Sequence, residues 1–99
     1  MSDASEAVRV QRQVVQWSER LYGRSHPETG KAQGVLCDFL LSGRAEAAEA
    51  QRYCLVAEHT LGAAPPAYRR ALLQARLRLA QAYIALGSAP AADSMLTQV

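Results

Sequence analysis

Apolar residues recur at intervals of three and four positions along most of this 99-residue chain, which is the spacing of one face of an α-helix. In residues 3–22 they form two neighbouring rows, Ala7, Val10, Val14, Trp17 and Leu21 in the first and Val8, Val15 and Tyr22 in the second. Arginine, glutamine and glutamate fill much of the remaining face. The pattern predicts an amphipathic helix over 3–22, which Gly23 ends as a C′ glycine.

The same spacing continues in four later segments, separated by short loops that contain glycine or proline. The expected helices cover 27–42, 45–61, 66–86 and a last stretch from about Ala89 to the end of the chain. Pro27 and Pro66 suit the first position of a helix, where the missing N–H costs nothing. Because short connections make neighbouring helices antiparallel, the predicted fold class is an all-α antiparallel array of about five helices.

The second helix carries two glycines in its interior. Gly30 and Gly34 lower its intrinsic helix propensity by about 1 kcal/mol each relative to alanine, so we expect them to allow close contact with a neighbouring helix. The residues of this helix that we expect in the core are apolar, namely Ala32, Val35, Leu36, Phe39 and Leu40.

Composition excludes several classes of protein. Apolar residues make up 49% of the chain and charged residues 20%, which is typical of a globular domain. A net charge of +2 is too small to imply nucleic acid or an anionic membrane as a partner. The N-terminus has no apolar signal-peptide core, and no run approaches the ~18 apolar residues of a membrane span. We therefore expect a cytoplasmic location, and the arginine-rich, asparagine-free composition suggests a bacterial source.

Cys37 and Cys54 are the only cysteines, and each lies in an apolar helical run outside any CxxC motif. The favoured interpretation is two buried thiols in a reducing cytoplasm. A disulfide or a metal site is the alternative.

An internal repeat is visible in the loops. Gly23 and Gly62 are 39 residues apart, and so are Pro27 and Pro66. A fixed period of this length is typical of α-solenoids, in which each repeat packs only on its neighbours.

These residues resemble tetratricopeptide repeats, in particular the longer-period kind found in kinesin light chains. The segment from Leu21 to Pro27 resembles the family's linker between repeats, and the segment from Gly43 to Glu49 its turn between the two helices of a repeat. Near the C-terminus the pattern of large and small residues is that of the family, with Leu79, Ala80, Tyr83, Gly87, Ala92 and Leu96. The resemblance implies one solenoid domain over 1–99, with a first helix at 3–22, repeat one at 27–61 and repeat two at 66–99, which is truncated if the repeat array is longer.

The resemblance also implies a concave groove lined by the first helix of each repeat. Mapped onto this chain, the lining residues come from 27–42 and 66–86 and are Gln33, Cys37, Leu40, Leu41, Gln74, Leu77, Arg78, Gln81 and Ile84. The basic and asparagine residues with which some members clamp a peptide carboxylate are missing. A mostly apolar groove with amide rims suits an apolar or amphipathic helix of a protein partner, or a second copy of the chain.

Two repeats are few for an independent solenoid, since about three are usually needed. Both ends should then expose apolar surface, and the candidates for self-association are Val8, Val15, Trp17, Leu96 and Val99. We expect a homo-oligomer or a domain completed by another chain.

The sequence offers little chemistry for catalysis. His26 lies in the linker between helices, where it should cap or pack against a helix end, and His59 lies near a helix C-terminus. No set of His, Cys and Asp residues has metal-binding spacing, so no metal or cofactor is expected. The leading hypothesis is a non-catalytic adaptor or scaffold. The alternative is a small bacterial chaperone or regulator that holds a partner's segment, and a less favoured one is an enzyme using Cys37 or His59.

Overall fold

Helices account for nearly all of the described chain, as the spacing of apolar residues predicts. A computed structural model describes residues 3–42 and 47–87 and contains no strand within them. Its elements are α1 (Asp3–Tyr22), α2 (Pro27–Ser42), α3 (Ala47–Gly62), a 3₁₀ turn η1 (Pro66–Tyr68) and α4 (Arg69–Ala85). The first two helices have the predicted bounds. The expected last helix, with Leu96 and Val99, lies outside the described residues.

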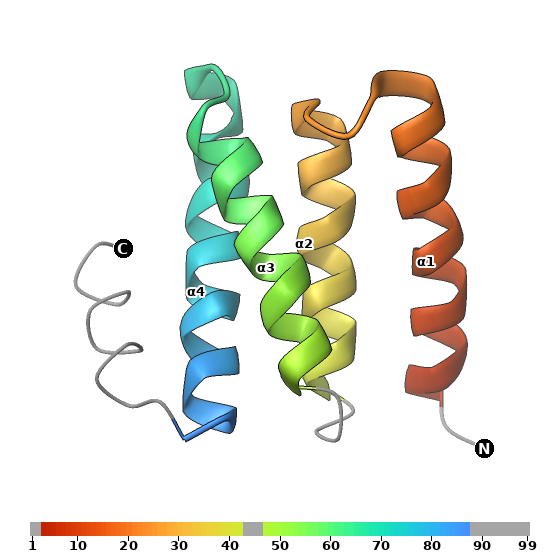
Figure 1. The fold of residues 1–99 in the computed structure, drawn as a ribbon, viewed down its shortest axis with the longest axis vertical. Coiled ribbons are helices and arrows are strands. Elements are labelled where there is room, and N and C mark those ends of the chain that lie inside the picture. The colour runs from red at the N-terminus through yellow and green to blue at the C-terminus, as the bar shows by residue number, and fades with distance from the viewer. Residues whose placement is uncertain (1–2, 43–46, 88–99) are drawn as a thin grey trace.

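The helices form a flat antiparallel array. Figure 1 shows α1 at one edge and α4 at the other, with α2 and α3 between them and α3 crossing in front of α2. The molecule measures 39 × 37 × 16 Å along its principal axes. Within the described residues α2 packs against α1, α3 and α4, whereas α1 packs mainly against α2. One side of α1 therefore has no neighbouring helix among residues 3–42 and 47–87.

The loop between α1 and α2 is held by short-range hydrogen bonds. Gly23 has φ +98°, a conformation that glycine adopts without steric cost, and its N–H donates to the Glu19 carbonyl at 2.9 Å. His26 Nδ1 accepts a hydrogen bond from the Glu28 N–H at 3.0 Å, and its ring stacks on Tyr22 with centroids 4.7 Å apart. The prediction that His26 caps and packs against a helix end is thus confirmed.

Close contact between α2 and α3 depends on the glycines of α2. A Cβ added to Gly30 would lie 3.1 Å from Thr60 Cγ2, and one added to Gly34 would lie 3.8 Å from the Ala57 side chain. Both Thr60 and Ala57 are buried. The two glycines therefore face α3, as expected, and Gly30 marks the tighter approach.

A disulfide crosses the same interface. Cys37 of α2 and Cys54 of α3 are bonded with a Cα–Cα distance of 5.5 Å, and neither residue is exposed. The prediction of two free thiols is wrong, because both cysteines lie on the facing sides of two closely packed helices. In a chain-entropy treatment a loop of this size, 17 residues in sequence separation, gives about 3 kcal/mol of stabilisation.

The core is built from one face of each helix. Its main cluster joins Val15 of α1 to Leu36 and Leu40 of α2 and to Leu79 of α4. Val35, a predicted core residue of α2, is 43% exposed instead. Because Val35 and Leu36 are adjacent and both apolar, the sequence alone could not show which of them faces inward.

Candidate functional site

A groove runs between α2 and α4. It consists of two adjoining hollows of about 270 and 480 Å³ that share Lys31, Ala71 and Gln74. The first hollow is lined by both helices and by one residue of α3, namely Lys31, Gly34, Val35, Asp38, Leu61, Ala71, Gln74, Ala75 and Arg78. The second is lined by the beginning of α2, by η1 and by the beginning of α4, with Glu28, Lys31, Ala67, Tyr68, Arg70, Ala71 and Gln74. We refer to the two hollows together as the α2/α4 groove.

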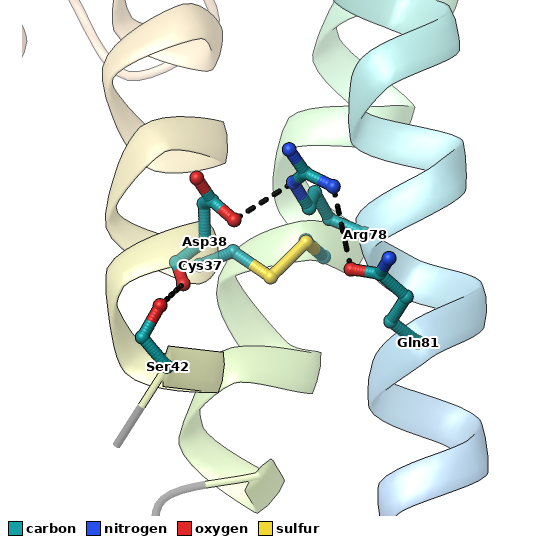
Figure 2. Close-up of polar contacts among 6 residues, drawn as sticks. Cys37, Asp38, Ser42, Arg78 and Gln81 are labelled. Carbon is teal, nitrogen blue, oxygen red and sulfur yellow. Dashed lines mark hydrogen bonds and ion pairs between the residues drawn. A yellow bond between two sulfur atoms is a disulfide. The ribbon is translucent and has the colours of Figure 1, made fainter. Parts of the chain in front are cut away.

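An ion pair closes the groove at one end. Arg78 Nε lies 2.8 Å from Asp38 Oδ1, so the pair joins α4 to α2 (Figure 2). Arg78 also donates from Nη1 to Gln81 Oε1 at 3.4 Å. Both charged side chains remain partly exposed, and exposed pairs of this kind contribute only about 0–1 kcal/mol to stability. The pair fixes the position of two charged groups at the rim of the groove.

A second polar cluster lies at the other end. The Tyr68 hydroxyl donates to Glu28 Oε2 at 2.8 Å, which ties η1 to the first turn of α2. Lys31 Nζ lies 3.6 Å from Glu28 Oε1 and 6.0 Å from the centroid of the Tyr68 ring. The hydrogen bond to the Glu28 carboxylate raises the pKa of Tyr68, because losing the proton would set two negative oxygens against each other.

The expected groove residues are divided between the surface and the core. Gln74 and Arg78 line the α2/α4 groove. On α4, Leu77, Gln81 and Ile84 are exposed beyond its lining, and Leu41 of α2 is half-buried. The other three residues of α2, Gln33, Cys37 and Leu40, are buried and present no surface to a partner.

The face of α2 that does line the groove carries Lys31, Val35 and Asp38. Their spacing of four and three places them on one side of the helix, adjacent to the glycine-containing side that faces α3. The structure has a hollow between the same two helices that the expectation from the repeat family named, but a neighbouring face of α2 lines it. The charged ends of this row, Lys31 and Asp38, were the available signal, since charges are rarely buried.

The outer side of α1 is the second exposed apolar surface. Of the self-association candidates, Val15 is buried and Val8 is half-buried against the core. Trp17 is 60% exposed, and it is accompanied by Val10 at 44% and Leu21 at 76%. Three residues of the first apolar row therefore face outward, whereas Val14 of that row packs on the core together with Val8 and Val15 of the second row.

Catalytic candidates find little support in the geometry. The Cys37 sulfur is bonded to Cys54 and buried, and His59 is an exposed residue in the last turn of α3. The Glu49 carboxylate, in the first turn of α3, binds Arg12. No group of three or more His, Cys, Asp or Glu side chains that could hold a metal ion occurs in 3–42 or 47–87.

Two further observations bear on the class of the protein. None of the helices described is both long and apolar enough to cross a bilayer. Comparison of the chain with protein-family models, with curated proteins and with solved structures finds no match. The features of this structure that bear on function are therefore its two surfaces described above, the α2/α4 groove and the outer side of α1.

Proposed function

We propose that this chain is a non-catalytic protein-interaction module that binds an apolar or amphipathic segment of a partner protein in the α2/α4 groove. The observation that carries the proposal is the composition of that groove. Its lining combines apolar side chains, among them Val35, Ala71 and Ala75, with the charged groups of Lys31, Asp38 and Arg78. In such a mixed lining the apolar side chains supply affinity for a bound segment and the polar groups orient it.

The architecture we propose is a tetratricopeptide-like solenoid of about two repeats. Its support is the recurrence of Gly23 and Pro27 at Gly62 and Pro66, each at the boundary between two antiparallel helices. In such an arrangement α2 and α4 are the first helices of successive repeats. The groove between them would then be the surface on which a partner's segment lies.

The disulfide bears on where such a module works. Disulfides persist in oxidising environments and are rare in the cytoplasm of mesophilic cells, where thiols are kept reduced. The Cys37–Cys54 bond therefore favours an extracytoplasmic location over the cytoplasm expected from the sequence. Oxidation state in cell extracts prepared with a rapid thiol-blocking reagent tests this location directly, since a cytoplasmic chain would be recovered with two blocked thiols.

Selection from a displayed library of random 16-residue peptides tests the groove. The affinity of peptides that bind the oxidised chain is then measured for Val35→Glu, which puts a charge in the groove lining, and for Val56→Glu as the matched control. Val56 is 46% exposed on α3, similar to Val35, and lies outside the groove lining. We expect Val35→Glu to weaken binding about tenfold or more and Val56→Glu to leave it unchanged. Equal effects of the two substitutions, or a library that yields no binder, would contradict the proposal.

A further inference from the structure

The outer side of α1 carries a regular apolar row whose exposed members, Val10, Trp17 and Leu21, are covered by nothing in the described chain, whereas Val14 lies at the inner edge of the row and packs partly on the core. Ala7, Val10, Val14, Trp17 and Leu21 follow one another at spacings of three, four, three and four residues. This is the spacing of the a and d positions of a coiled coil, with Ala7, Val14 and Leu21 at a and Val10 and Trp17 at d. Val10 is 44% exposed, Trp17 60% and Leu21 76%, whereas Ala7 and Val14 are half-buried. The row therefore has the pattern of a helix-pairing surface.

The internal repeat indicates that this side of the helix is one that packs against another helix. At a period of 39 residues, Leu21 of α1 corresponds to Thr60 of α3. Thr60 is 9% exposed and faces Gly30 of α2. The equivalent position of α1 has no helix opposite it in the described structure, and it carries a larger apolar residue.

Charged residues beside the row identify what kind of helix fits it. Glu6, Gln13 and Arg20 occupy the g positions that flank the row on one edge, with the acidic residue near the start of α1 and the basic residue near its end. In an antiparallel helix pair the g positions of the two helices face each other. A second copy of α1 running the opposite way would place Arg20 of the partner subunit beside Glu6, and the two-fold axis would repeat that pair.

The same register also matches side-chain size. It places Ala7 opposite Trp17 of the partner subunit, and Val10 opposite Val14 of the partner subunit, so that the smallest residue of the row meets the largest. A parallel pair would instead bring g positions against e positions, which here are the uncharged Gln11 and Ser18. Charge and size complementarity thus both favour the antiparallel arrangement.

We propose that two copies of this chain form a two-fold symmetric dimer through antiparallel pairing of the outer α1 row, with Glu6 of each subunit beside Arg20 of the other. The contact uses the same patch on both subunits and closes on itself, so it does not propagate. It lies at the edge of the array opposite α4, away from the α2/α4 groove, and is independent of the function proposed for that groove.

Trp17 reports on this interface because it is the only tryptophan of the chain. Light scattering of the full chain over a hundredfold range of concentration should show a mass that rises from 10.7 kDa to twice that value. The tryptophan emission should shift to shorter wavelength over the same range, as the indole leaves water. A monomer throughout, or a dimer whose formation leaves the emission unchanged, would overturn the proposal.

Substitution in the row has a matched control. Leu21→Glu should weaken dimerisation at least tenfold, whereas Leu55→Glu, at an apolar residue of α3 that is 42% exposed, should not. Circular dichroism checks that both variants keep the helical fold. Loss of the dimer in Leu55→Glu but not in Leu21→Glu would place the interface elsewhere and contradict the proposal.

Charge reversal tests the direction of the two helices. Glu6→Arg alone and Arg20→Glu alone each set like charges against each other twice, so each variant should dimerise less than the wild type. Mixed together, the two variants restore both opposite-charge pairs and should form a heterodimer that native mass spectrometry separates by mass. Arg9→Glu changes a charge of α1 outside the g positions. It is therefore the control for effects of a charge change that act within one helix and not between the two subunits. A mixture that gives no excess of heterodimer would overturn the antiparallel register.

Discussion

Arg12 of α1 and Glu49 of α3 form a bidentate ion pair. Nη1 of Arg12 lies 2.5 Å from Oε2 of Glu49, and Nη2 of Arg12 lies 3.0 Å from Oε1 of Glu49. The two residues are 37 positions apart in sequence, and both of their helices pack against α2. The fork geometry of the guanidinium matches that of the carboxylate, so the pair fixes the orientation of α1 relative to α3.

This pair makes stability depend on pH on the acid side. The hydrogen bond from Arg12 holds the pKa of Glu49 below its usual value of 4.5, more strongly than partial burial opposes it. Because the folded-state pKa is the lower one, the stabilisation is present above pH 4.5 and is lost as the pH falls through the folded-state value. Glu49→Gln should therefore reduce the free energy of unfolding by about 1 kcal/mol at pH 7 and by progressively less below pH 4.5.

Urea unfolding of the wild type and of Glu49→Gln at several pH values measures this difference. Glu19→Gln, on the same helix as Arg12, is the control for removing one negative charge. A difference between wild type and Glu49→Gln that stayed constant down to pH 2 would show that the ionised pair is not its source.

Reduction of the Cys37–Cys54 disulfide should destabilise the fold without a change in secondary structure. The bond restricts the unfolded chain, so its loss is expected to cost about 3 kcal/mol, or a fall in Tm of about 10–20 °C for a domain of this size. Thermal unfolding followed by circular dichroism with and without a phosphine reductant measures the effect. The double variant Cys37→Ala, Cys54→Ala should melt at the same temperature in both buffers. Identical melting of the wild type in both would show that the bond contributes no stability.

The two glycines of α2 should respond in opposite ways to alanine. Gly34→Ala adds a Cβ at an ordinary contact distance of 3.8 Å from Ala57, so the gain in helix propensity should stabilise the protein by about 0.5–1 kcal/mol. Gly30→Ala adds one 3.1 Å from Thr60 Cγ2 and 3.2 Å from Leu61 Cγ, both on buried residues. Overpacking there should outweigh propensity and leave a net loss of about 1 kcal/mol. Chemical denaturation of the two variants compares their free energies of unfolding. An increase for Gly30→Ala would mean that α3 shifts easily to make room for the added methyl group.

The sequence predicted helix positions well because the signals for them are local. Pro27 and Gly23 mark helix ends by their own backbone preferences, and the structure begins α2 and ends α1 at these points. The close approach of α2 and α3 at Gly30 could also be predicted. Glycine lowers the propensity of a helix interior, so two glycines inside a helix indicate close contact with a neighbouring helix. The groove was expected between the helices of 27–42 and 66–86, and the structure has a groove between α2 and α4.

What the sequence left open was the rotation of each helix about its axis. α1 carries two apolar rows of similar quality, and only the packing partner decides that Val15 faces inward and Trp17 outward. In α2 the sequence alone could not show which of Val35 and Leu36 faces inward, and the lining expected from the repeat family lies on a neighbouring face of the helix. The disulfide was only the alternative interpretation for a related reason, because pairing Cys37 with Cys54 requires knowing which sides of two helices meet.

Gln33 provides a last test of the α2 orientation. The residue is 5% exposed, and its side-chain Oε1 has no hydrogen-bond partner among the described residues. A buried polar atom without a partner costs about 1–3 kcal/mol, and methionine has a similar length and no such atom. Gln33→Met should therefore raise the free energy of unfolding by about 1 kcal/mol in urea denaturation. Gln74→Met, at an exposed position of α4, should leave stability nearly unchanged. A destabilised Gln33→Met would instead indicate that the amide is bonded, through its nitrogen or a buried water molecule, and that Gln33 is a polar contact that holds α2 in its rotation.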